Sequence, residues 1–251
     1  MPDVMIVTGG SRGIGAATAI LGAKAGYAVV VNYASNREAA DKVVAAIAAD
    51  GGSAIAVRGD VGVEADILAI FEAADRFGTL TALVNNAGVV DAALPLAEMS
   101  AARLDRMFRI NVTGSLLCAR EAVRRMATSR GGKGGGIVNL SSVAAKLGGP
   151  GQYVDYAASK GAIDTFTVGL AKEVIDEGIR VGAVRPGIID TDIHASGGQP
   201  NRVAELGPGL PMRRAGTAEE VAKAILWLLS EEASYSTGAI IDVSGARSIL
   251  P

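Results

Sequence analysis

The chain has 251 residues, 49% of them hydrophobic and 20% charged, so we expect a globular protein rather than a disordered one. Its 24 basic and 26 acidic residues give a formal net charge of −2, without the basic excess that nucleic-acid binding needs. The single cysteine, Cys118, excludes an internal disulfide. Because there is also only one histidine, His194, we expect no metal site.

The apolar runs are far shorter than the roughly 20 residues that a membrane-spanning helix needs. The first residues have the pattern of a β-strand rather than of a secretory signal. We therefore expect a soluble, cytoplasmic protein without a membrane partner.

Short apolar runs rich in β-branched residues alternate with helical periodicity along the whole chain. Continuous apolar runs are typical of strands that are covered on both faces. The runs lie at residues 4–8, 28–32, 54–57, 82–85, 136–140, 179–184 and 239–243. Since no Pro- or Ser-rich linker divides the chain, we predict a single α/β domain over residues 1–251, with a doubly wound parallel sheet of about seven strands.

Residues 190–212 form the only long stretch without a clear period, and they contain Gly-Gly and Gly-Pro-Gly segments. Loops of this length usually have a function. We predict a substrate loop that acts as a mobile lid. The alternative is a loop held permanently against the body by Ile193, Leu206 and Leu210. We interpret His194 in this loop as a solvated side chain, and Trp227, in an apolar helical stripe, as part of the core.

A glycine-rich motif, TGGSRGIG at residues 8–15, follows the first strand and opens a helix. Glycines at such a place let the backbone turn tightly and approach a pyrophosphate, which the free N–H groups of the helix N-terminus can bind. A purely structural turn is the alternative. The motif predicts a dinucleotide site.

Tyr156 and Lys160 lie four positions apart, which places them on one face of a helix. A nearby ammonium favours the phenolate, so such a tyrosine can exchange a proton near neutral pH. Tyr153 has no lysine at the same spacing. Ser142 follows the fifth strand, where parallel sheets bind ligands, and its hydroxyl can bind a carbonyl oxygen. Ser141 competes with it for this role.

These motifs, in this order, resemble the short-chain dehydrogenase/reductase family over residues 4–245. Further matches are the Asn-Asn-Ala-Gly segment at 85–88, Asn111, Asp60-Val61 and the segment from Pro186 to Thr191. The resemblance implies a Rossmann-type fold and hydride transfer between a nicotinamide cofactor and an alcohol or carbonyl compound. It departs from the family at the end of the last strand, where Ser-Gly-Ala-Arg stands in place of Asp-Gly-Gly.

The resemblance assigns a role to each member of the catalytic set. It makes Tyr156 the acid/base, Lys160 its pKa partner and a ligand of the nicotinamide ribose, and Ser142 the residue that holds the carbonyl. Asn111 holds a water of the proton relay through a local bend in its helix. The predicted cofactor contacts are Gly9, Ser11, Arg12, Gly13, Ile14, Gly15, Asn32, Ser35, Arg37, Asp60, Val61, Asn86, Ala87, Gly88, Tyr156, Lys160, Pro186, Gly187, Ile189 and Thr191.

The residues after the second strand favour NADP(H) over NAD. NAD sites usually place an acidic residue there for the ribose 2′-hydroxyl, but this chain reads Asn-Tyr-Ala-Ser-Asn-Arg at 32–37. Arg12 and Arg37 suit a 2′-phosphate instead. Ordinary surface arginines are the alternative.

The substrate stays open between two classes, because the chain is similar both to 3-oxoacyl-carrier-protein reductases and to glucose 1-dehydrogenase-like enzymes. Arg213 and Arg214 are a weak indication of a carrier protein, but these two residues and Arg202 equally suit any loop. A non-catalytic dinucleotide-binding regulator is a third reading, against which the intact catalytic set argues. Since members of the family are mostly tetramers, the resemblance also implies a homotetramer.

Overall fold

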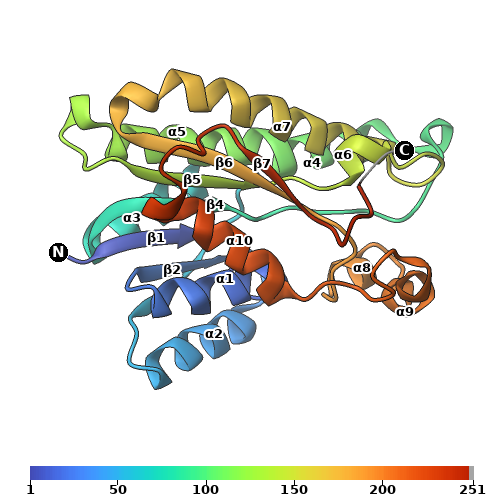
Figure 1. Cartoon of the computed structure of the whole chain (residues 1–251), viewed down its shortest axis with the longest axis horizontal. Coiled ribbons are helices and arrows are strands. Elements are labelled where there is room, and N and C mark those ends of the chain that lie inside the picture. The colour runs from blue at the N-terminus through green and yellow to red at the C-terminus, as the bar shows by residue number, and fades with distance from the viewer. Residues whose placement is uncertain (249–251) are drawn as a thin grey trace.

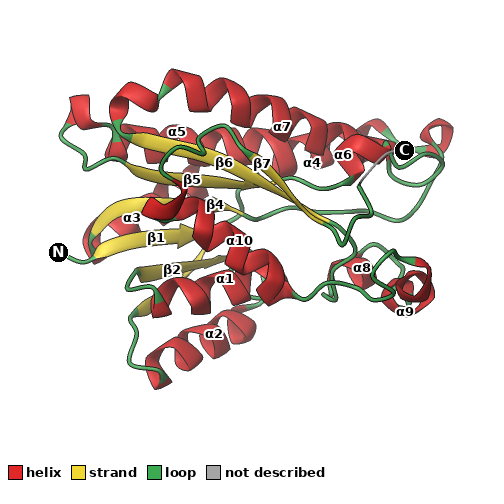
Figure 2. Cartoon of the chain, in the orientation of Figure 1, coloured by secondary structure: helices red, strands yellow, loops and turns green. Residues whose placement is uncertain are grey.

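The protein, represented by a computed structural model, is described for residues 1–248, with the side chains of residues 194 and 196 left out. All seven predicted runs form strands of one sheet, and every neighbouring pair is parallel. The strand order is β3-β2-β1-β4-β5-β6-β7 (Figures 1 and 2). The strands are β1 (Asp3–Val7), β2 (Ala28–Tyr33), β3 (Ala54–Arg58), β4 (Thr79–Asn85), β5 (Gly135–Leu140), β6 (Ile179–Pro186) and β7 (Ile240–Val243).

Helices cover both faces of the sheet, as the continuous apolar strands predict. Buried side chains of α1, α2 and α10 pack on one face, and those of α3, α5 and α7 pack on the other. The helices are α1 (Gly13–Lys24), α2 (Arg37–Ala49), α3 (Glu64–Phe77), α4 (Ala101–Phe108), α5 (Ser115–Met126), α6 (Ala144–Leu147), α7 (Val154–Glu173), α8 (Ile193–Ser196), α9 (Arg202–Leu206) and α10 (Ala218–Leu229).

Strand β1 shows why both layers are needed. Its Val4 and Ile6 enter one core cluster and Met5 and Val7 the other, because successive side chains of a strand point to opposite faces. All four residues are completely buried. From β1 the strands are added in one direction to β3, and from β4 they are added in the other direction to β7, so the strand order reverses between β1 and β4. Ligands of doubly wound folds bind at the carboxyl ends of the strands beside such a switch point.

Two features of the structure differ from the sequence prediction. Trp227 is 38% exposed, so its assignment to the core was wrong. It lies roughly 200° around α10 from Ile225, which faces the sheet, and therefore points outward. Residues 190–212 contain the short helices α8 and α9, whose few turns are too short to show a period in the sequence.

A buried chain of amide and hydroxyl groups crosses the sheet below the site. Asn85 Nδ2 donates to the Ser115 carbonyl at 3.0 Å and to Asn139 Oδ1 at 2.9 Å. Asn139 Nδ2 donates in turn to Thr167 Oγ1 at 3.0 Å, and Thr167 donates to the Ile163 carbonyl. Because β4, β5, α5 and α7 each supply a group, this chain of hydrogen bonds fixes the two helices against the strands.

We expect Asn139→Ala to lower the free energy of unfolding by about 2 kcal/mol, because it removes a buried partner from both Asn85 and Thr167. Urea denaturation of the variant and the wild type measures the difference. Asn201→Ala, at an exposed asparagine, is the matched control and should change stability by less than about 0.5 kcal/mol. Equal losses in the two variants would contradict the role of the buried chain.

Candidate active site

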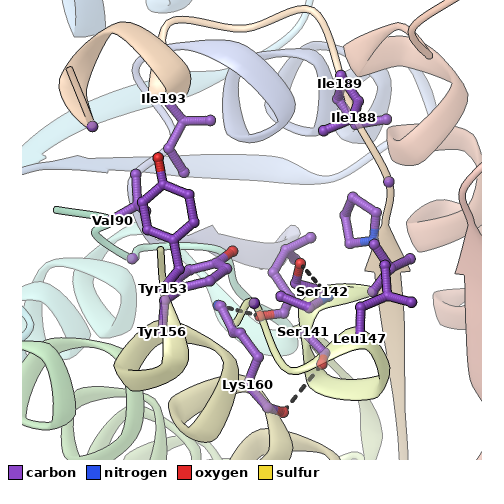
Figure 3. A pocket seen from close by; sticks show the side chains of 18 of the residues that line it. Val90, Ser141, Ser142, Leu147, Tyr153, Tyr156, Lys160, Ile188, Ile189 and Ile193 are labelled. Carbon is purple, nitrogen blue, oxygen red and sulfur yellow. Dashed lines mark hydrogen bonds between the residues drawn. The ribbon is translucent and has the colours of Figure 1, made fainter. Parts of the chain in front are cut away.

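A cavity of about 490 Å³ lies at the carboxyl ends of β5 and β6, beside the start of α7 and under residues of α8 and α9 (Figure 3). Ser142, Tyr156 and Lys160 line it together with apolar side chains such as Leu147 and Ile188. The cavity therefore combines groups that can move a proton with surfaces that suit a carbon skeleton.

The glycine-rich loop reaches the cavity in the compact form that its sequence predicts. Gly9 and Gly13 have φ of +60° and +53°, the left-handed region that favours glycine. A Cβ on Gly15 would lie 2.4 Å from the carbonyl oxygen of Gly9. The Asn86 amide donates to the carbonyls of Thr8 and Gly9 at 2.8 and 2.9 Å, so Asn86 shapes this loop directly.

Two buried polar residues hold the same loop from the sheet. Asn32 Oδ1 accepts the N–H of Gly9 at 3.1 Å, and its Nδ2 donates to the Gly59 carbonyl at 2.9 Å. The Asn32 side chain is thus occupied by backbone groups, and it contributes by supporting the loop. Thr8 Oγ1 accepts the N–H groups of Asn86 and Ala87, both at 3.0 Å. The position of Thr8 at the start of the glycine-rich motif did not predict this separate role.

The N-terminus of α1 has the features of an anion site. Arg12 is its N-cap residue, no side chain of the described residues caps it, and its first turn holds no acidic residue. Its first N–H groups lack helical partners, and the helix dipole favours negative charge there. A Cβ on Gly13 would lie 3.1 Å from Thr191 Cγ2, so Thr191 covers this end of the helix. This cradle fits the pyrophosphate of a dinucleotide.

Tyr156 and Lys160 share one face of α7, as their spacing predicts, and Lys160 Nζ lies 5.6 Å from the centre of the Tyr156 ring. Lys160 is buried and donates to the carbonyl of Leu140 at 2.6 Å. Burial lowers the pKa of Lys160 to about 8, although the charge of Asp164 opposes this. Burial raises the pKa of Tyr156, and hydrogen bonding to Ser142 acts in the lowering direction. In the protein alone, burial therefore outweighs the expected favouring of the phenolate.

The structure distinguishes the two candidate serines. The Ser141 hydroxyl is buried and donates to the carbonyl of Lys160 at 3.2 Å, so it joins β5 to α7. Ser142 is half-buried, accepts the N–H of Ala144 at 3.1 Å and still has a proton to donate. Figure 3 shows Ser142 and Tyr156 on neighbouring walls of the cavity.

Asn111 lies in a π-helical turn, Arg109–Gly114, which joins α4 to α5. Its side chain is fully buried and pairs with the backbone of Val89, accepting the N–H at 2.8 Å and donating to the carbonyl at 2.9 Å. It also donates to Ser159 Oγ at 3.2 Å. A Cβ on Gly88 would lie 3.3 Å from Asn111 Oδ1 and 3.6 Å from Lys160 Nζ, so these residues converge beside the cavity.

Most of the predicted cofactor contacts fall into two groups. One group lines the cavity: Ile14, Asn86, Gly88, Tyr156, Lys160, Pro186, Gly187, Ile189 and Thr191. The other group lies away from it at the carboxyl ends of β2 and β3, where Ser35, Arg37 and Asp60 are exposed and Val61 is buried. Asp60 accepts the N–H of Gly62 at 2.8 Å and so shapes its own turn. The glycine-rich loop connects the two groups.

Three arginines belong to segments that meet at the end of β2, where the N–H of Gly10 donates to the Asn32 carbonyl at 2.8 Å. Arg12 and Arg37 are the predicted pair, and Arg58, at the end of β3, donates to the Ala34 carbonyl at 3.4 Å. Arg37 forms an exposed ion pair with Asp41 at 3.3 Å. Within residues 1–248, neither Arg12 nor Arg58 forms an ion pair. The sequence did not point to Arg58, because Arg58 reaches the end of β2 only through the pairing of β3 with β2.

A buried ion pair fixes the start of α7. Arg103 Nε of α4 donates to Asp155 Oδ2 at 2.8 Å, and their side chains are 8% and 0% exposed. Arg103 also donates to the carbonyl of Ala92 at 2.6 Å. Asp155 precedes Tyr156, so the pair positions the segment that carries the phenol. Nothing in the sequence links residues 103 and 155.

We expect Arg103→Ala to lower the free energy of unfolding by about 3 kcal/mol, because it leaves a buried carboxylate without its partner. Thermal or urea unfolding at neutral pH tests this. Arg106→Ala, which removes an exposed ion pair with Asp91, is the control and should cost less than about 1 kcal/mol. If the two variants are equally stable, Arg103 and Asp155 do not form the buried pair.

Two further searches of the described residues gave negative results. None of their helices is both long and apolar enough to cross a membrane. No group of three or more His, Cys, Asp or Glu among them is arranged to hold a metal ion. The side chain of His194 lies outside the described residues.

Comparison with known proteins agrees with this geometry. Residues 9–246 match the family model described as enoyl-(acyl carrier protein) reductase. The chain is 54% identical over 245 residues to the uncharacterized oxidoreductase YgfF of Escherichia coli, covering 97% of this chain and 99% of that protein. It is 39% identical to glucose 1-dehydrogenase 2 of Bacillus subtilis, covering 98% and 95%. It is 40% identical to a Synechocystis 3-oxoacyl-[acyl-carrier-protein] reductase, covering 97% and 96%.

A solved structure of a Serratia marcescens short-chain dehydrogenase/reductase mutant superposes with a TM-score of 0.88 at 33% identity, covering 98% of both chains. The chain therefore belongs to the short-chain dehydrogenase/reductase family, a family of oxidoreductases that use a nicotinamide cofactor.

Proposed function

We propose that this protein is an NADP(H)-dependent oxidoreductase that interconverts an alcohol and a carbonyl compound. The observation that carries the proposal is the meeting of Ser142, Tyr156 and Lys160 in one cavity, next to the uncapped N-terminus of α1. A non-catalytic regulator would need the cradle but not this set of proton-handling groups.

The cofactor, when bound, supplies or accepts the hydride. In the reduction direction, Ser142 donates a hydrogen bond to the substrate carbonyl oxygen and holds it beside the phenol. Tyr156 then gives its proton to that oxygen, which suits a phenol whose pKa is raised by burial. Ser142 and Tyr156 thus hold the carbonyl oxygen and its proton donor in a geometry that is set in advance.

Lys160 and Asn111 support the phenol in this proposal. The pKa of Lys160, about 8, leaves it mostly protonated at neutral pH, so its charge favours the phenolate that forms after proton transfer. Lys160 also binds the nicotinamide ribose. Asn111, at the π-helical turn, holds the water through which the proton is returned.

We expect Tyr156→Phe to lower kcat at least 100-fold, because it removes the acid/base while keeping the ring. NADPH binding should change less than threefold, since the phenol acts on the proton rather than on the dinucleotide. Steady-state kinetics and fluorescence titration give the two values. Tyr153→Phe is the matched control on the same helix end and should be much milder. A Tyr156→Phe enzyme that keeps more than a tenth of wild-type turnover would exclude this role.

The preference for NADP(H) rests on the arginines around the end of β2. In the part of the chain that the structure describes, neither Arg12 nor Arg58 has a carboxylate partner, and no acidic residue lies between the end of β2 and Arg37. Arginine matches the oxygens of a phosphate with its planar fork of donors. This charge favours a 2′-phosphate over a 2′-hydroxyl.

We expect NADPH to bind more tightly than NADH. Arg12→Ala and Arg58→Ala should each weaken NADPH binding about tenfold or more, which is the effect of one charge-assisted phosphate contact. Arg37→Ala should have a smaller effect, because Asp41 already neutralises part of this charge. The affinity for NADH in the same variants is the control. Equal dissociation constants for both cofactors in the wild type would overturn the assignment.

We further propose that residues 190–212 cover the substrate, since Ile193, Gly197, Arg202 and Leu206 line the cavity. Their mobility as a lid stays a prediction.

For the assembly we propose a homotetramer. Exposed apolar side chains on the α4, α5 and α7 layer, such as Phe108, Leu116 and Val168, support it. We also propose a cytoplasmic location.

The two substrate classes stay proposals. The glucose 1-dehydrogenase and the 3-oxoacyl reductase match at nearly equal identity, so similarity does not choose between them. Arg213 and Arg214 do not line the cavity, and Arg214 pairs with Glu220 at 2.7 Å. The expected indication of a carrier protein from these two residues is therefore weakened, and the substrate class has to be argued from the cavity itself.

A further inference from the structure

Two arginines from distant parts of the chain line the cavity. Arg202 comes from α9, and Arg247 comes from the segment after β7. Both are half-buried. The lining also includes Lys160, but it includes no aspartate or glutamate among the described residues.

Neither arginine has a charged partner in the part of the chain that the structure describes. Arg202 donates to Gln152 Oε1 at 3.3 Å and to Gln199 Oε1, and its guanidinium lies 5.4 Å from the centre of the Tyr153 ring. These partners orient Arg202 but leave its charge uncompensated. Arg180, Arg185 and Arg214 behave differently, because each forms an ion pair at 2.7 to 3.0 Å.

The two guanidinium groups also act on each other. Burial lowers the pKa of Arg247, and the positive charge of Arg202 lowers it further. Like charges held together and partly out of water are unfavourable unless an anion joins them. A carboxylate between two guanidinium groups would remove this cost and form charge-assisted hydrogen bonds.

We propose that Arg202 and Arg247 bind a carboxylate carried by the substrate, so that the carbonyl compound is an oxo acid and the alcohol a hydroxy acid. The proposal rests on the function proposed above and names its substrate class. The placement follows from Tyr153, which lies three residues before Tyr156 and stacks under Arg202. The carboxylate is thus held near the phenol, at the other end of a short carbon skeleton.

The remaining walls fit such a skeleton. Val90, Leu147, Ile188 and Leu206 line the cavity with apolar side chains, which suit an aliphatic or aromatic chain better than a polyhydroxylated sugar. An oxyanion could also come from the phosphate of a carrier-linked thioester. We favour the carboxylate because both arginines lie inside the cavity with the catalytic residues, whereas Arg213 and Arg214 lie outside its lining.

Matched aldehydes test the proposal kinetically. Para-formylbenzoate and its methyl ester share the ring and the aldehyde but differ in charge. We expect the wild type to reduce the acid with a kcat/KM about tenfold or more above that of the ester, which is the effect of a charge-assisted contact. Arg202→Ala and Arg247→Ala should each remove most of this preference and change the ester less than threefold. Arg247→Lys should keep part of it.

The control variant is Arg213→Ala. Arg213 is exposed, directly follows residues 190–212 and does not line the cavity. It should leave both substrates unchanged. If the wild type treats acid and ester alike, or if the arginine variants lower both equally, the inference fails while the oxidoreductase activity stands.

Binding gives a second measurement that needs no turnover. Calorimetric titration of benzoate into the protein, with and without NADP⁺, should show binding that benzamide lacks and that both alanine variants weaken about tenfold. No benzoate binding overturns the inference, and so does binding of inorganic phosphate in preference to benzoate. Benzoate binding without reduction of either aldehyde, and without NADP(H) binding, would instead contradict the proposed function and leave the anion site in place.

Discussion

The arrangement of the catalytic face depends on the buried ammonium of Lys160. Its hydrogen bond to the Leu140 carbonyl, at 2.6 Å, joins α7 to the carboxyl end of β5, and the Ser141 hydroxyl returns a second bond to the Lys160 carbonyl. These two bonds fix α7 against the strand end that precedes Ser142. The relative position of Ser142 and Tyr156 therefore follows from the lysine, which makes it a structural residue as well as a charged one.

A second feature of the molecule is how its positive charge is distributed. Most arginines away from the ligand sites form ion pairs, such as the three that converge on Glu121 of α5. Among the described residues, the half-buried Arg202 and Arg247 of the cavity form no ion pair. Because a partly buried charge without a partner is unfavourable, these positions are sites where the folded protein gains most from an anionic ligand.

The sequence predicted those features that depend on local pattern or on a contiguous motif. The apolar runs predicted all seven strands, and the spacing of Tyr156 and Lys160 predicted their common helix face. Contacts between distant segments left no such signal. Arg58 reaches the end of β2 through strand pairing, and Arg247 reaches the cavity from the end of the chain.

The sequence also did not reveal whether burial or a neighbouring charge has the larger effect on a pKa. The expected effect of Lys160 on Tyr156 was reasoned from charge alone, whereas the fold adds enough burial to raise the pKa of the phenol. Trp227 shows the same limit for packing, because an apolar stripe does not reveal which side of it faces the sheet. The sequence also did not show that Asn32 joins the glycine-rich loop to the end of β3, since its Oδ1 accepts the N–H of Gly9 and its Nδ2 donates to the Gly59 carbonyl.

The π-helical turn at Asn111 has a consequence for how the chain can vary in length. Helices α4 and α5 continue through this turn as one helix, in which the wide turn holds an extra residue. Deleting one residue there would convert the wide turn into an ordinary α-helical turn, so the faces of α4 and α5 would keep their relative orientation. Cys118 and Ala122 would then stay in the core, whereas Asn111 would lose the position from which it pairs with Val89. Core packing in this segment thus accommodates a one-residue deletion that the site geometry does not.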